Sequence, residues 1–454
     1  MAESRVIRWG GGIVGRVLAL GAAIAVNGCG AEDSGTSKPP TNHPCGTETG
    51  TGCAPDSQRV DLYEPTFSHP TTVTNPLFPI SKLDSVVFLG HVDGKPFRTE
   101  TTLLPETRIL DWQGKKVETL VSQYMAFLDG RIEEIALDWY AQDDRGGVWY
   151  FGEDVADFED GVIYTHEGTW LEGKDGPLAM IMPADPQVGD AYNAETIPGV
   201  AWEEVTVKEV GVTLDGPAGP IQGCMIGSEL HADGAREEKI FAPGHGEFST
   251  SDKADLEALA LALPADALSG SPPAELDTLA KGTVIIFDVV DAVDWTAAGD
   301  ALTSAKNAWA SFGAGELPPL LADQMKVAVA ALGAAVDGHD AGAARHQAIA
   351  VARLTFDFRL RHRPVTEIDS VRFDLWAAQV LVDGAADDAG GIKGDTATLE
   401  LVWNRIAQTF DAAKAAEIEG KLGDLRTAAD AEDVGQAVTI ATAVRAALAG
   451  SGWK

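Results

Sequence analysis

The chain has 454 residues, a formal net charge of −35 and a pI near 4.4, which argues against nucleic-acid binding because phosphates require a basic protein surface. A chain of this length is expected to form about two or three domains. Hydrophobic residues make up 45% of it, which is enough for buried cores. An acidic surface keeps an exported protein soluble and attracts loosely bound cations.

Residues 1–29 have the features of a bacterial lipoprotein signal peptide. A region with three arginines precedes an apolar run, residues 17–26, which is shorter than the roughly 20 residues that a membrane span needs. The segment ends in Gly28-Cys29, which resembles a lipobox, so Cys29 is the expected lipidation site. The alternative is an ordinary signal peptide in which this cysteine occurs by chance.

A lipid anchor would hold this acidic chain to a membrane that its charge would otherwise avoid. The expected protein is therefore membrane-anchored and faces the periplasm or the cell exterior. Gly30 follows the cysteine, where Asp typically signals inner-membrane retention, so the outer membrane is expected if the cell is Gram-negative. No later stretch is expected to span a bilayer.

Residues 30–60 contain almost no large apolar side chains and are predicted to form a disordered tether. Cys45 and Cys53 lie in this segment and are expected to form a disulfide in an oxidising compartment. Cys224 lies in a strand-like run and is expected to be a buried, inert thiol rather than a nucleophile.

Residues 61–250 carry the period-two alternation of apolar and polar side chains that predicts β-strands, separated by turn signals such as VDGK and LDGR. No helical crossover lies between these runs, so the sheet is expected to be antiparallel. The number and length of the strands indicate a strongly curved sheet or half-barrel.

The stretch ALDWYAQDDRGGVWYFGEDV, residues 136–155, alternates on both sides of an Asp-Asp-x-Gly-Gly turn, which predicts a β-hairpin. Trp139 is expected to pack into the sheet, whereas Asp138 and Tyr140 are expected to face outward. The loop carboxylates offer oxygen ligands for Ca²⁺, but the ligand spacing of a calcium hand is missing. Turn formation is therefore the preferred explanation of the loop.

Four motifs within residues 75–250 occur together: DWYAQDDRGGVWYFGED, THEGTW, IMPADPQVGDAY and KIFAPGHGEF. Together they resemble a family of uncharacterised bacterial lipoproteins and secreted proteins. The last motif is also similar to the closing strand of half-barrel envelope proteins related to lipoprotein carriers, although Phe241 and His245 depart from the usual pattern. The resemblance implies a fold and an envelope location, and it implies no reaction.

Residues 251–282 are rich in Ala, Pro, Ser and Asp and are interpreted as a linker. From 283 to 454, apolar residues recur every three to four positions, which predicts amphipathic helices with a break at Pro364. The C-terminal part is expected to be an all-α bundle of roughly five to seven helices. The whole chain is thus predicted to be a multidomain α+β protein.

A polar stripe marks two successive predicted helices. His346, Arg353 and Asp357 share one helix face, and Asp369 and Arg372 lie on a comparable stripe of the next helix. One interpretation is a small-ligand or metal pocket in the bundle. The other is a network of ion pairs that fixes helix register, which the mixture of Arg and Asp favours.

His231 and His245 have acidic neighbours and are further candidate metal ligands, but three strands would have to converge to build such a site. The sequence has no nucleophile elbow, zinc-protease motif or Walker loop, so no catalytic residue and no cofactor is predicted. The chain is interpreted as a non-catalytic envelope lipoprotein that holds a small apolar ligand in its sheet. The alternative is a periplasmic metal-binding protein that uses the bundle or the acidic surface.

Overall fold

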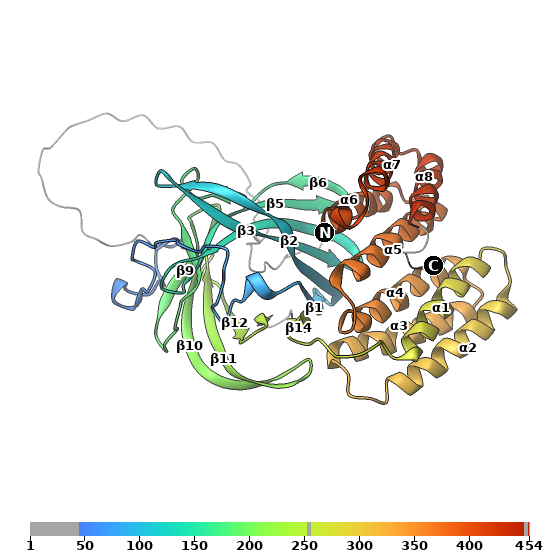
Figure 1. Cartoon of the computed structure of the whole chain (residues 1–454), viewed down its shortest axis with the longest axis horizontal. Coiled ribbons are helices and arrows are strands. Elements are labelled where there is room, and N and C mark those ends of the chain that lie inside the picture. The colour runs from blue at the N-terminus through green and yellow to red at the C-terminus, as the bar shows by residue number, and fades with distance from the viewer. Residues whose placement is uncertain (1–44, 252–255, 449–452, 454) are drawn as a thin grey trace, which may run out of the picture.

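The computed structural model describes residues 45–251, 256–448 and 453. Within them, an antiparallel sheet of 14 strands is followed by α-helices, which is the predicted α+β order (Figure 1). Cys29, the signal peptide and the first part of the predicted tether lie outside the described residues, so the lipid anchor stays a prediction.

The sheet is built from long hairpins. Its strands are β1 (Ser85–Val92), β2 (Lys95–Trp112), β3 (Lys115–Leu128), β4 (Arg131–Gln142), β5 (Val148–Glu159), β6 (Val162–Thr165), β7 (Trp170–Leu171), β8 (Ala179–Met182), β9 (Ala191–Ile197), β10 (Ala201–Gly216), β11 (Gly219–His231), β12 (Arg236–Ala242), β13 (Gly246–Ser251) and β14 (Leu256–Leu263). Their order is β6-β5-β4-β3-β2-β1-β14-β13-β12-β11-β10-β9, with β7 and β8 paired to β5. The chain therefore runs outward from β1 and returns so that β14 lies beside β1.

The predicted turn signals form the hairpin turns. Asp93 and Gly94, which join β1 to β2, have φ values of 51° and 74°. Asp129 and Gly130, which join β3 to β4, have φ values of 51° and 79°. Two successive positive φ values define the type I′ turn, whose twist matches that of the flanking strands. These short signals therefore set the register of the hairpins.

The hairpin predicted over residues 136–155 is confirmed as β4 and β5. In its turn, the Asp143 carboxylate accepts hydrogen bonds from the backbone N–H groups of Arg145 and Gly147 at 2.9 Å, and from Trp149 Nε1 at 2.9 Å. The expected outward orientation of Asp138 and Tyr140 is wrong, because both residues are only 3% exposed. Their face of the sheet is covered by the rest of the β domain.

The sheet is neither closed nor strongly curled, so the expected half-barrel is corrected to an open antiparallel sheet. β6 and β9 are its two end strands. The free edge of β9 is covered by the N-terminal segment, in which Arg59 forms a parallel bridge with Ala191. This covering protects the strand edge from other chains without closing a barrel.

The described N-terminal segment, residues 45–60, contains a disulfide that closes a short loop. Cys45 and Cys53 are bonded, with their Cα atoms 5.5 Å apart, as the sequence predicts. The described part of the predicted tether is ordered against the sheet, since the backbone N–H of Glu48 donates to Ala232 and that of Ala54 donates to Glu204. Cys224 is a buried free thiol, also as expected.

The expected linker over residues 251–282 is wrong. It contains β14, which pairs with both β1 and β13, and the first half of the first helix. The run LEALALAL lacks the period-two alternation of an edge strand because β14 lies inside the sheet and its side chains are buried on both faces. Its Leu and Ala content is therefore similar to that of a helix or a linker.

Eight α-helices follow within the described residues, slightly more than the sequence indicates. They are α1 (Ala274–Val289), α2 (Trp295–Phe312), α3 (Pro319–Asp337), α4 (Ala341–Leu360), α5 (Val365–Ala385), α6 (Ala389–Ile406), α7 (Ala412–Asp430) and α8 (Val434–Ala447). Pro364 separates α4 from α5, as predicted. Aspartates cap five of the helices by accepting a backbone N–H from the first turn: Asp294, Asp340, Asp388, Asp411 and Asp433.

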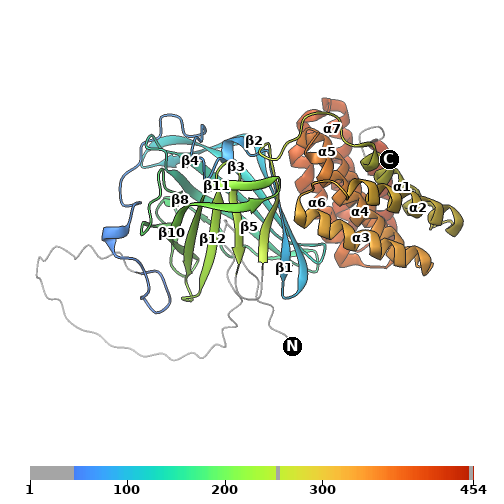
Figure 2. The ribbon, with the colours of Figure 1, turned by 90° about the horizontal axis from the view of Figure 1, so that it is seen from below.

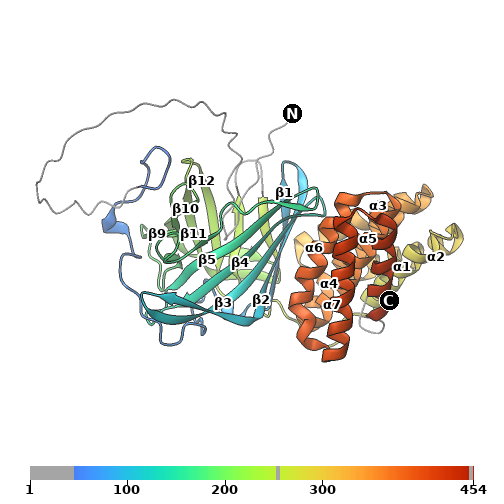
Figure 3. The same cartoon turned by 90° about the horizontal axis from the view of Figure 1, so that it is seen from above.

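The helices pack on the outer face of the sheet, and Figures 2 and 3 show them gathered beside one end of the strands. Met125 and Phe127 of β3 share a hydrophobic cluster with Phe373 and Trp376 of α5 and Trp403 of α6. The rings of Phe127 and Trp376 stack with their centroids 5.2 Å apart. One face of β3 therefore belongs to the interface with the bundle, while the other belongs to the interior of the β domain.

Among the described residues, α3 is long and apolar enough to cross a membrane by length and composition alone, contrary to the expectation that no later stretch is. However, Leu321, Met325 and Leu332 of α3 are fully buried in the hydrophobic cluster of the bundle. A core helix meets the same criteria, so packing against neighbouring helices accounts for its composition.

Candidate functional site

The polar stripe predicted in the bundle forms part of a buried ion network. Arg372 donates to Asp369 and to Asp357, each at 2.9 Å. All three residues are at most 2% exposed. The structure therefore brings together three of the five predicted residues, one from α4 and two from α5.

Strand β2 and helix α6 complete this network. Arg98 donates to both oxygens of Asp357 at 2.8 and 3.0 Å, and Arg405 donates to Glu100 at 3.1 Å. Burial would raise the pKa of Glu100, but the three surrounding arginines outweigh it and lower that pKa. Three arginines thus meet three carboxylates, which supports the ion-pair interpretation of the stripe. Sequence reasoning missed the β2 and α6 partners because they lie on other elements.

The other two predicted residues lie outside the network. The Arg353 guanidinium lies 4.5 Å from the ring centroid of Trp376, a cation–π contact. His346 is exposed and borders a cleft of about 590 Å³ between the β-domain hairpins and α6. Asp388, which caps the start of α6, and Asp395 of α6 also line that cleft. The five residues therefore do not form one ligand site.

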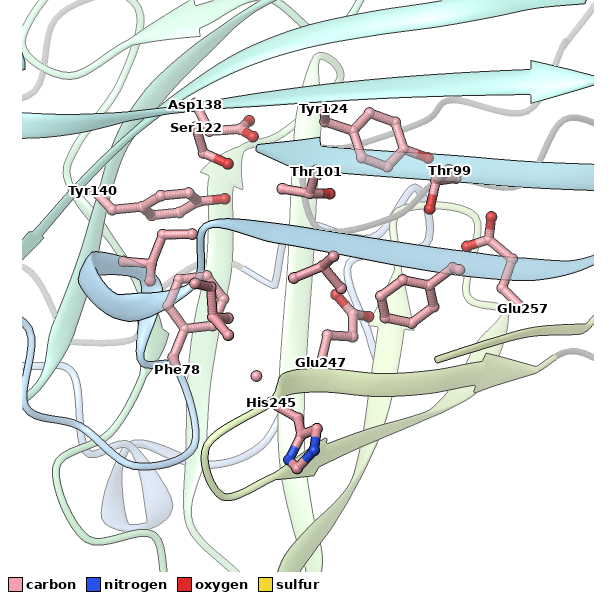
Figure 4. Close-up of a pocket in the computed structure, with 15 residues that line it drawn as sticks. Phe78, Thr99, Thr101, Ser122, Tyr124, Asp138, Tyr140, His245, Glu247 and Glu257 are labelled. Carbon is pink, nitrogen blue, oxygen red and sulfur yellow. The ribbon is translucent and has the colours of Figure 1, made fainter. Parts of the chain in front are cut away.

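A different cavity, of about 80 Å³, lies on the inner face of the sheet (Figure 4). The strands β1 to β4 supply one wall, and β13, β14 and the segment before β1 supply the other. Its lining residues are Phe78, Ile80, Leu83, Val86, Phe88, Thr99, Thr101, Ser122, Tyr124, Asp138, Tyr140, His245, Gly246, Glu247 and Glu257. The cavity opens at Phe78, His245 and Glu247, which are partly exposed.

One end of the cavity is apolar. The rings of Phe78 and Tyr140 meet edge to face, with their centroids 5.1 Å apart. Ile80, Leu83 and Val86 continue this wall, and all three are buried. Period-two alternation in β1 and the short turn before it place these side chains inward. This end therefore fits a hydrocarbon group.

The other end is polar and contains buried groups without a partner. Neither the Tyr124 hydroxyl nor either carboxylate oxygen of Glu257 has a hydrogen-bond partner within the described residues. Glu257 is 2% exposed and Tyr124 is 7% exposed. Figure 4 shows Tyr124, Thr99 and Glu257 together at this end, and Phe78 and Tyr140 at the other. A buried polar group without a partner is rare in folded proteins and marks a place where a ligand can bind.

Burial and neighbouring acids change the protonation of two carboxyls that line the cavity, Glu257 at the polar end and Asp138 near Tyr140 (Figure 4). Burial, followed by the charges of Glu247, Glu134 and Glu237, raises the pKa of Glu257 well above its usual range, although Lys239 opposes this. Burial also raises the pKa of Asp138 to about 7. Both carboxyls therefore retain protons at pH values where exposed acids have lost them.

A second polar cluster adjoins the cavity. Glu203, Glu229 and His231 offer ligand atoms that lie within 4.8 Å of one another. Lys239 pairs with Glu229 at 3.0 Å and lies 3.8 Å from Glu247, which lines the cavity. Two neighbouring strands supply these atoms, Glu203 from β10 and both Glu229 and His231 from β11, rather than the three strands that the metal interpretation requires. The Lys239 ammonium of β12 already neutralises part of the acidic charge.

His245 lies in the turn between β12 and β13. Its Nδ1 is 3.0 Å from the carbonyl oxygen of Pro243, and its Nε2 is 3.3 Å from a carboxylate oxygen of Asp266. Burial would lower the pKa of His245, but these two contacts outweigh it and raise that pKa. His245 therefore belongs to the mouth of the cavity rather than to a metal cluster with His231.

Sequence reasoning missed the two residues that distinguish the cavity. Tyr124 lies in a strand whose residues are almost all buried, and Glu257 is the one acid within LEALALAL. A single carboxyl inside an apolar run is a usable signal, because burying it without a partner is costly.

Comparison of the chain with protein-family models and with curated proteins finds no match. The resemblance to uncharacterised bacterial lipoproteins therefore stays a prediction, and the function is argued from the site.

Proposed function

We propose that this protein is a non-catalytic binding protein of the cell envelope whose β domain holds a small, largely apolar ligand. The observation that carries the proposal is the cavity on the inner sheet face, where an apolar wall faces the unpartnered Tyr124 hydroxyl and Glu257 carboxyl. Ligand sites typically combine an apolar lining with a few polar groups that fix orientation. A bound polar group would also satisfy donors and acceptors that otherwise cost about 1–3 kcal/mol each.

The envelope part of the proposal rests on the N-terminal sequence and the disulfide. Acylation of Cys29 would anchor the acidic chain to a membrane, facing the periplasm or exterior, and to the outer membrane in a Gram-negative cell. The Cys45–Cys53 bond supports an oxidising compartment. The test is C29S followed by cell fractionation: the altered chain should leave the membrane fraction, and unchanged sedimentation would contradict the anchor.

Cavity binding is tested by filling the cavity. Val86→Trp places a bulky ring into the lining, whereas Val188→Trp adds the same ring at a site that is 64% exposed. Ligand-observed NMR should show saturation transfer from wild type and from V188W to 1-butanol, and none from V86W. Thr101→Met, at a partly exposed lining position, is a milder filling variant should V86W not fold. Equal saturation transfer from the cavity-filling variants and from wild type, or no transfer from wild type, contradicts the proposal.

Metal binding is the second candidate function. The arrangement of Glu203, Glu229 and His231 favours the β domain for it, rather than the bundle, whose buried acids already meet arginines. Elemental analysis of the protein, purified without chelators, should then find one divalent ion per chain in wild type and none in His231→Gln. A metal content far below one ion per chain in wild type contradicts this candidate.

A further inference from the structure

The polar end of the cavity selects a chemical class of ligand. We propose that the ligand of the β-domain cavity carries a protonated amine, which pairs with the Glu257 carboxylate while its hydrocarbon part occupies the apolar end. This inference rests on the proposed binding function and names the ligand class of the same site.

No cation pairs with Glu257 among the residues that the structure describes, and it is 2% exposed. The largest charge effects on its pKa come from Glu247, Glu134 and Glu237, and Lys239 opposes them. Lys239 is itself paired with Glu229 at 3.0 Å. None of the described residues that line this end of the cavity is a lysine or an arginine.

The opposite face of the same sheet provides a contrast. Glu100, which lies on β2 and is equally buried, meets Arg98 at 2.8 Å and Arg405 at 3.1 Å. At this buried acid the fold thus supplies arginines from both the sheet and the bundle. Glu257 lines a cavity that can admit a ligand and has no arginine partner within the part of the chain that the structure describes, which is the arrangement expected if the cation comes from outside.

The chemistry of an ammonium group matches the neighbouring side chains. It carries three N–H donors and no acceptor, so it can donate to the Glu257 carboxylate and to the Tyr124 hydroxyl oxygen. The rings of Phe88 and Tyr124 line the same cavity and present π faces that attract cations. A carboxylate ligand would instead add negative charge beside Glu247 and Glu257.

The proton balance follows from the buried carboxyl. A cationic amine that enters from water displaces the proton of Glu257 to solvent, which leaves one carboxylate paired with one ammonium and no net change in cavity charge. The volume of about 80 Å³ corresponds to several water molecules, since one water needs roughly 10–15 Å³ on this scale. A short primary alkylamine therefore fits, and a longer chain can extend through the open side.

The test uses three probes with the same carbon chain, n-butylamine, 1-butanol and butyrate, titrated into the full-length chain by NMR. Wild type should bind butylamine about tenfold or more tightly than butanol, as one charge-assisted hydrogen bond contributes, and butyrate more weakly still. Glu257→Gln should reduce the preference for the amine to about twofold or less. Glu238→Gln, an exposed acid on β12, should leave it unchanged.

The outcomes separate the two proposals. Equal binding of butylamine and butanol, or an unchanged preference in E257Q, overturns the amine class while the cavity still binds ligand. Preferred binding of butyrate overturns it as well. No binding of any probe overturns the cavity function itself. Tyr124→Phe keeps the test decisive if E257Q does not fold, because loss of one acceptor should weaken the amine preference and leave butanol affinity nearly unchanged.

Discussion

Arg98 and Asp357 form a two-point ion pair across the interface between the β domain and the helical bundle, with N–O distances of 2.8 and 3.0 Å. Arg98 comes from β2 and Asp357 from α4, and both are buried. Asp357 also accepts from Arg372 at 2.9 Å. One carboxylate thus pairs with two arginines that belong to different parts of the chain, so it couples the sheet to the bundle.

Asp357→Asn should therefore destabilise the protein strongly. The change leaves two buried guanidinium groups with less negative charge and turns an amide N–H toward their donors, at a cost of about 3–5 kcal/mol. The free energy of unfolding in urea measures the effect. Asp111→Asn, which removes the acid of an exposed pair with Lys116 on the same sheet, should change it little. Equal stabilities for the two variants would contradict a structural role for the network.

Gly161→Ala should separate the β5–β6 turn from α6. A Cβ atom at Gly161 would lie 2.1 Å from the carbonyl oxygen of Gly390 and 2.5 Å from the backbone N of Gly394. Gly94→Ala is the matched control, because Gly94 has φ +74° against +73° and nothing within 4 Å of its Cβ position. Both variants carry the strain of a positive φ. Only G161A adds a steric clash, which should lower the free energy of unfolding by about 1–3 kcal/mol more.

The measurement for this pair is the difference in unfolding free energy between the two variants, together with hydrogen exchange of the α6 amides. Faster α6 exchange in G161A alone is the expected result. A G161A protein as stable as G94A, with unchanged α6 exchange, would show that the turn does not pack on the helix.

Asp138→Asn should flatten the pH dependence of stability. Burial raises the folded-state pKa of Asp138 from 3.8 to about 7, so the folded state binds more protons than the unfolded state between these values. Stability must therefore fall as the pH rises from about 4 to about 7. The amide of D138N can still accept the hydrogen bond that Tyr150 donates at 2.7 Å. Urea unfolding at pH 5 and pH 8 should show a smaller loss in D138N, and parallel curves would disprove the assignment.

Lys239→Met should destabilise the protein more at pH 8 than at pH 5. Lys239 is 1% exposed and pairs with Glu229. Burial and the charge of Glu203 raise the pKa of Glu229 to about 8, although Lys239 opposes this. Removal of the ammonium raises that pKa further, so ionisation of Glu229 at higher pH becomes more costly. The expected loss is about 3–5 kcal/mol near neutral pH.

Lys208→Met, at an exposed site on β10, is the control for removal of one positive charge. Urea unfolding of both variants at the two pH values gives the comparison. If K239M and K208M lose the same stability at both, Lys239 does not compensate the buried acids.

Much of the local structure could be predicted because its signals lie within a few residues. The Asp-Gly pairs predicted tight turns, and the alternation around Trp139 predicted the hairpin of β4 and β5. The helices could be recognised from their apolar period and from the break at Pro364. β14 was missed because a strand inside a sheet needs no polar face, so its pattern lacks the alternation that identifies strands at a surface.

The candidate site was less predictable. The stripe of Asp357, Asp369 and Arg372 was recognised on two helices, but Arg98 and Glu100, which decide its role, come from a strand far away in the chain. Glu257 gave only a weak signal, since a lone carboxyl in an apolar run shows burial and does not show what surrounds it.

The sequence by itself determined the order of a β region and a helical region, the hairpin turns, the disulfide and the acidic charge, because these depend on composition and near neighbours. Only the tertiary structure decided which buried acids have a counterion. Glu100 is matched by arginines from α5 and α6, whereas Glu257 faces a cavity without one. The physical reason is that charge compensation in a buried site is summed over side chains from many elements, and their positions are set by packing rather than by distance along the chain.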